Sequence, residues 1–122
     1  KTQNLNDTSL VYRMTFPNGK VALFLGDLAE LGGENLANEY GSRLKSDIVQ
    51  MSHHGQNGVS KRVYELIDPD ICLWPTPKWL WENDSGEGFN TGDWLTLDTR
   101  SWMDEIGEQV HAVMKDGDIT LI

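Results

Sequence analysis

The chain has 122 residues, which suffices for one domain with a hydrophobic core and is too short for two independent cores. Nineteen acidic and 10 basic side chains give a formal net charge of −9. This charge repels phosphate backbones and argues against nucleic acid as a general partner. It does not exclude a small phosphorylated substrate.

The N-terminal part of the chain predicts a β-hairpin. Residues 9–16 alternate between an apolar face and a more solvent-exposed face that contains Val11, Arg13 and Thr15. Asn18-Gly19 supplies turn residues, and residues 21–25 form a strand that is apolar on both faces. The apolar set of the first strand comprises Leu10, Tyr12, Met14 and Phe16.

Two helices and two more strands are expected in the middle of the chain. Leu36, Tyr40 and Leu44 recur at four-residue spacing, which predicts an amphipathic helix over residues 34–45. A strand over residues 47–52 follows, and then a helix over residues 60–67 that Ser60 caps. The apolar run at residues 71–75 is the next buried strand.

The last third of the chain is rich in tryptophan and less regular. We expect a loop at residues 83–90, a helix at 99–106 and a terminal hairpin made of residues 110–114 and 119–122. The tryptophans are expected to pack, with a sugar or peptide groove as the alternative. The whole order predicts a single α/β domain, residues 1–122, with a mixed sheet and helices packed on one face.

One face of this sheet is expected to lack a cover. The strands at 21–25 and 71–74 are apolar on both sides, but the few helices can cover only one side. Large exposed apolar patches are uncommon on monomers. The open face is therefore expected to bind a second copy of the chain in a homodimer or a missing segment of the same protein.

The candidate functional residues follow two neighbouring strands. Asp27 ends the strand at 21–25, and His53 and His54 follow the strand at 47–52. In open α/β sheets, ligands bind at the carboxyl ends of the strands, and a carboxylate with imidazoles is a zinc-type donor set. The alternatives are a helix-capping role for Asp27 and a hydrogen-bonded loop for the histidines.

The remaining chemistry-bearing residues are expected to be structural. His111 lies in an expected strand, and Cys72 sits in an apolar run as a core residue rather than a thiolate ligand. As Cys72 is the only cysteine, no disulfide can form within the chain, which favours a reducing compartment such as the cytoplasm. No apolar stretch has membrane-spanning length, and residues 1–7 do not resemble a signal peptide.

An ordered set of motifs makes the resemblance to a family specific. The chain reads Asn-Asp-Thr-Ser-Leu-Val at 6–11, Leu-Phe-Leu-Gly-Asp at 23–27, Ser-His-His-Gly at 52–55 and Asp-Pro at 68–69. Over roughly residues 6–75 it resembles the metallo-β-lactamase superfamily, and within it the branch typified by the hydrolase-like domain of the competence protein ComEC.

The resemblance implies a fold and a metal site. The family's αββα sandwich consists of two similar halves, and this chain looks like the C-terminal half. Asp27 matches the aspartate that bridges two zinc ions, and His53 matches the last histidine ligand. His54 matches the second histidine of the motif and is expected to belong to the metal site behind the direct ligands. Asp27 and His53 are thereby the implied catalytic residues, because the metals generate a hydroxide nucleophile.

The chain also departs from the family pattern. The signature His-x-His-x-Asp-His is absent, and Gln56 stands where relatives usually have Ser. Catalytic zinc needs about three protein ligands, so hydrolysis by this chain alone is not expected. Two hypotheses follow: the C-terminal part of a metal-dependent hydrolase that acts on a small-molecule or phosphoester substrate, or a non-catalytic, degenerate module for protein–protein association.

Overall fold

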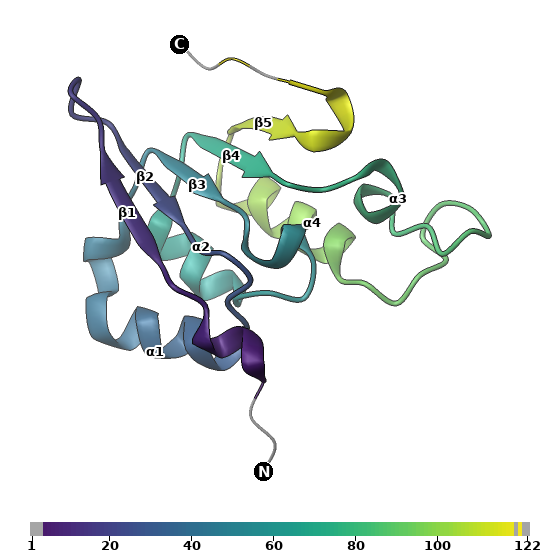
Figure 1. Cartoon of the computed structure of the whole chain (residues 1–122), viewed down its shortest axis with the longest axis horizontal. Helices are drawn as coiled ribbons and strands as arrows, with labels where there is room; N and C mark the ends of the chain where they lie inside the picture. The colour runs from purple at the N-terminus through teal and green to yellow at the C-terminus, as the bar shows by residue number, and fades with distance from the viewer. Residues whose placement is uncertain (1–3, 119, 121–122) are drawn as a thin grey trace.

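A computed structural model, which describes residues 4–118 and 120, shows a five-stranded mixed sheet with helices on one face (Figure 1). The strands lie in chain order; β1 runs antiparallel to β2, and the other neighbours are parallel. The predicted α/β fold class is confirmed. The strands are β1 (Tyr12–Thr15), β2 (Val21–Phe24), β3 (Ile48–Gln50), β4 (Ile71–Trp74) and β5 (Val110–Val113).

A turn joins β1 to β2, and helical segments connect the later strands. The α-helices are α1 (Glu30–Tyr40), α2 (Lys61–Ile67), α3 (Lys78–Trp81) and α4 (Thr96–Ile106). The 3₁₀ turns are η1 (Leu5–Thr8), η2 (Gly41–Leu44), η3 (Ser52–Gly55) and η4 (Met114–Asp116). No helix in the described part of the chain has the length and apolar character needed to cross a bilayer.

Helix α1 is displaced from its predicted range. It begins at Glu30 instead of residue 34 and passes through Gly33, where a Cβ would lie 2.7 Å from Cγ1 of Val59. The glycine pair weakens the helical signal in the sequence, but it lets α1 approach the chain before α2 closely. The helix ends before Gly41, whose φ of +51° is unfavourable for other residues.

Two further details differ from the sequence-based predictions. Ser60 precedes α2, but its hydroxyl donates to the Glu34 carboxylate and does not cap the helix backbone. β5 pairs in parallel with β4, because α4 provides the crossover that parallel strands require. Of the expected hairpin partner 119–122, residues 119, 121 and 122 lie outside the described residues.

The main core lies between the sheet and the helices. Leu23, Val49 and Cys72 pair across β2, β3 and β4 and are buried on the helix side. Val63, Tyr64 and Ile67 of α2 and Met103 of α4 complete this layer and are also buried. Figure 1 shows α1, α2 and α4 on this side of the sheet.

The opposite face of the sheet is apolar and open, as the sequence predicts. The strand registers align two rows of side chains across all five strands. Three of the four residues at the ends of these rows are strongly exposed, with Tyr12 at 62%, Val110 at 60% and Met14 at 48%, whereas Ala112 is buried. We call this surface the open face; its rows are Met14, Ala22, Ile48, Ile71 and Val110, and Tyr12, Phe24, Gln50, Leu73 and Ala112.

Candidate functional site

The candidate site lies where β2 and β3 end at the same edge of the sheet. Gly26 and Asp27 follow β2, and η3 follows β3 after Met51. The backbone N–H of His53 donates to the Gly26 carbonyl at 2.9 Å. The Gly26 N–H donates to Oε1 of Gln50 at 2.8 Å, so Gln50 and His53 together fix the residue before Asp27.

The two histidines occupy an unusual turn. His53 has φ/ψ of 52°/47° and His54 has 59°/21°, so two successive non-glycine residues are left-handed. Such residues persist where the surrounding structure enforces them, and they cluster at functional sites. The sequence indicates a turn here because Gly55 follows, but it gives no sign of the left-handed pair.

Hydrogen bonds to Tyr64 of α2, to the segment after β2 and to Thr76 after β4 hold this turn. The Ser52 N–H donates to the Tyr64 hydroxyl at 3.1 Å, and the Ser52 hydroxyl donates to the Leu28 carbonyl. The Thr76 hydroxyl donates to the His54 carbonyl at 2.6 Å. Burial raises the pKa of Tyr64, so its hydroxyl stays neutral across the physiological range.

Both imidazole rings are oriented by backbone carbonyls. Nδ1 of His53 lies 3.1 Å from the Asn57 carbonyl oxygen, and Nδ1 of His54 lies 2.8 Å from that of Pro75. A carbonyl can only accept, so each Nδ1 must carry the hydrogen. In the neutral rings this leaves a lone pair on Nε2, the arrangement that orients metal-binding histidines.

Asp27 faces one of these Nε2 atoms. Its Oδ1 lies 3.7 Å from Nε2 of His54, and the two side chains are half exposed, at 49% and 50%. This separation is too long for a hydrogen bond. Two donors on one tetrahedral zinc lie roughly 3.3 Å apart, so a small shift would let this pair share a cation.

His53 lies beside this pair. Its ring centroid is 6.2 Å from that of His54. Within residues 4–118 and 120, no group of three or more histidine, cysteine or acidic side chains is arranged to hold a metal ion. The donor types therefore fit a zinc-type cation, but their number falls short of the three protein ligands of a catalytic site.

The other histidine and the cysteine have structural surroundings. The indole N–H of Trp74 donates to Nδ1 of His111 at 2.9 Å, so His111 carries its hydrogen on Nε2, the opposite tautomer to that of the site histidines. Burial lowers the pKa of His111. Burial also raises the pKa of Cys72 to about 12, which keeps its thiol protonated.

The tryptophans mostly pack, in line with the expectation. Trp74 meets Trp81 edge-on with ring centroids 5.0 Å apart, and Trp79 meets Trp94 with ring centroids 5.1 Å apart.

Three residues that position the site were not singled out from the sequence. They are Gln50, Tyr64 and Thr76. Thr76 follows a strand end, as Asp27 does, so the same rule could have identified it; Tyr64 lies within a helix and gave no such signal.

Comparison with known proteins finds a similarity in sequence over part of the chain. The chain is 33% identical over 69 residues to the competence protein ComA of Neisseria gonorrhoeae, a match that covers 56% of this chain and 10% of that protein. No family model and no solved structure matches the chain. The chain is thus similar to part of a competence protein, and its match spans a small share of that protein's length.

Gly55 provides a test of the turn. It has a φ of +84°, and a Cβ there would lie 2.4 Å from Cε3 of the buried Trp74. We expect Gly55→Ala to lower the free energy of unfolding by about 3 kcal/mol, because it combines backbone strain with overpacking. Urea denaturation followed by tryptophan fluorescence measures this loss.

Gly19 is the matched control. Its φ of +86° is nearly the same, but a Cβ there would meet nothing within 4 Å. Gly19→Ala should therefore cost only the backbone strain, about 1 kcal/mol. Equal losses for the two variants would show that Trp74 does not pack against the turn.

Proposed function

We propose that this chain supplies one side of the metal site of a metal-dependent hydrolase of the metallo-β-lactamase superfamily, within a competence-related protein. The observation that carries the proposal is the arrangement of Asp27, His53 and His54 at one sheet edge, with each imidazole Nδ1 tied to a carbonyl. The similarity to a competence protein supports the same branch of the superfamily.

The role of each residue follows from its contacts. His54 and Asp27 form the closest donor pair, and His53 adds a second imidazole beside it. Gln50, Tyr64 and Thr76 hold these donors in place through backbone hydrogen bonds. A dinuclear zinc centre, when bound, would lower the pKa of a coordinated water and so supply the hydroxide for hydrolysis.

The proposal requires further ligands from outside this chain. We expect them on a segment with the pattern His-x-His-x-Asp-His, located in the N-terminal half of the same protein. The open face supports this arrangement, because an apolar sheet face is the surface on which the second sheet of an αββα sandwich packs. The coding sequence upstream of residue 1 is the simplest place to check it.

The net charge of the chain limits the class of substrate that the site is expected to accept. The net charge of −9 disfavours a long phosphate backbone and is compatible with a small ester or phosphoester. Fold alone does not assign the bond that is cleaved. We therefore propose hydrolysis of a small-molecule ester or phosphoester by the completed site.

Zinc titration of the 122-residue chain tests the ligand assignment. We expect binding with a dissociation constant of roughly micromolar or weaker, because the ligand set is partial. Asp27→Asn and His54→Gln should each weaken binding at least ~10-fold, since each removes one donor of the facing pair. Isothermal titration calorimetry measures the change.

Asp70→Asn is the matched control for this titration. Asp70 is exposed and directly precedes β4, at the edge of the sheet opposite the strand ends that carry the site, so the variant removes the same charge and should leave zinc binding unchanged. If Asp27→Asn and Asp70→Asn had the same effect, zinc would be responding only to net charge, and the assignment of Asp27 as a ligand would fail.

A second candidate function is a non-catalytic module for protein–protein association. The specific observation in its favour is the open face, which remains apolar across all five strands. In this alternative, Asp27 and His54 are only neighbouring, half-exposed side chains whose contact contributes little to stability. A second copy of the chain is then the partner that covers the face.

Sedimentation velocity tests this association. We expect the chain to form dimers through the open face, and the double variant Tyr12→Ser/Val110→Ser to weaken them at least ~10-fold by removing exposed apolar area. Leu31→Ser is the control, because Leu31 is also exposed, at 48%, but lies on α1. A monomer at millimolar concentration, or an equal effect of the control, would contradict association through this face.

A further inference from the structure

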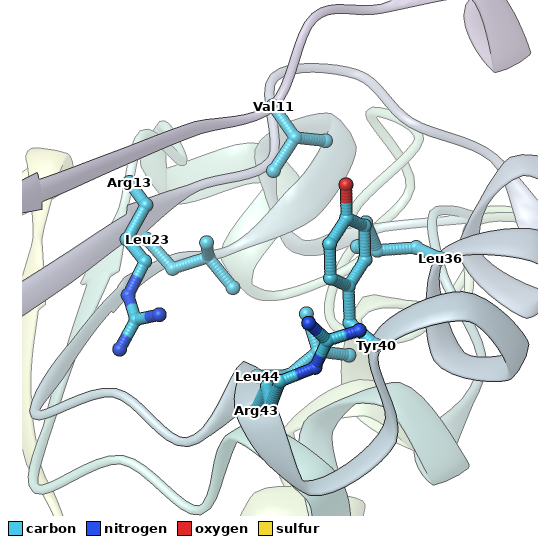
Figure 2. Close-up of a pocket in the computed structure, with 7 residues that line it drawn as sticks. All are labelled: Val11, Arg13, Leu23, Leu36, Tyr40, Arg43 and Leu44. Atoms are coloured by element: carbon cyan, nitrogen blue, oxygen red, sulfur yellow. The ribbon is translucent and has the colours of Figure 1, made fainter.

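A second concave site lies on the helix side of the sheet, between β1, α1 and η2. Its cavity has a volume of about 290 Å³ (Figure 2). Four aliphatic side chains line it, from the chain before β1, from β2, from α1 and from η2. They are Val11, Leu23, Leu36 and Leu44.

The aliphatic part forms the inner wall of the cavity. Leu23 and Leu44 are almost fully buried, and Val11 and Leu36 are half buried. This part of the cavity offers no polar side chain to solvate an inserted group, so it suits a hydrocarbon chain.

The remaining lining residues are cationic or phenolic. Arg13 and Arg43 reach into the same opening from β1 and η2, with Tyr40 beside Arg43 (Figure 2). Arg43 donates to the Glu39 carbonyl at 3.1 Å, and its guanidinium carbon lies 5.1 Å from the centre of the Tyr40 ring. These contacts hold the guanidinium near the opening.

Arg13 has free hydrogen-bonding capacity. Among the residues that the structure describes, its side chain makes no hydrogen bond or ion pair. None of the lining residues is acidic, although the chain as a whole carries a net charge of −9. The cavity is thus a local positive site, and guanidinium groups bind carboxylates through paired hydrogen bonds.

We propose that this cavity binds a small carboxylate with an aliphatic tail. The guanidinium groups of Arg13 and Arg43 bind the carboxylate, and the tail inserts between the leucines. At about 30 Å³ for each water-sized group, the cavity holds roughly ten non-hydrogen atoms. A medium-chain fatty-acid carboxylate such as octanoate has this size, whereas a folded peptide element is too large.

Isothermal titration calorimetry with sodium octanoate tests the proposal on the 122-residue chain. We expect saturable binding of one octanoate with a dissociation constant on the order of 10⁻⁴ M. Octanol, which lacks the charge, and inorganic phosphate, which lacks the tail, should each bind at least ~10-fold more weakly. Equal affinity for octanol or for phosphate would overturn the proposal.

Variants locate the binding site. Arg13→Gln and Arg43→Gln should each weaken octanoate binding at least ~5-fold, and Leu36→Trp should abolish it by filling the cavity. Lys20→Gln is the control, because it removes the same charge from the exposed β1–β2 turn outside this cavity. Unchanged binding by Arg13→Gln, or an equal loss with Lys20→Gln, would overturn the site. Circular dichroism checks that each variant is folded.

Discussion

The turn at residues 52–55 is the constraint on which the candidate site depends. Two consecutive left-handed histidines are costly, by roughly 1–2 kcal/mol for each residue, and they need enforcement from outside the turn. Tyr64 and Thr76 supply it through hydrogen bonds, and the buried ring of Trp74 leaves room for nothing larger than Gly55. The positions of the imidazoles are therefore set by α2 and β4, which belong to the packed core.

Two features of the structure are consistent with the proposed second sheet. Among the residues that the structure describes, the donors at the sheet edge are fewer than a catalytic metal site needs, and the open face exposes apolar side chains such as Tyr12 and Val110. A second sheet packed on the open face would cover the apolar rows and could bring further ligands to the same edge. In this proposed arrangement, folding and metal binding would be coupled, because neither half would hold the complete ligand set.

Much of the fold was predictable because it rests on local patterns. Apolar runs located β2, β3 and β4, and the strand-end rule placed Asp27 beside η3. The sequence did not predict the early start of α1, because Gly32 and Gly33 weaken the helical pattern while allowing close packing on Val59. The contacts of Gln50, Tyr64 and Thr76 were also not predicted, because they join residues that are distant in the sequence.

Long-range ¹H–¹⁵N NMR of the histidine side chains tests the central claim most directly. Without zinc, we expect His53 and His54 to carry the hydrogen on Nδ1 and His111 to carry it on Nε2. Zinc should shift the Nε2 signal of His54 and leave His111 unchanged, and Asp27→Asn should weaken this response. The same tautomer in all three rings, or an equal zinc response at His111, would contradict the proposed metal site of Asp27, His53 and His54.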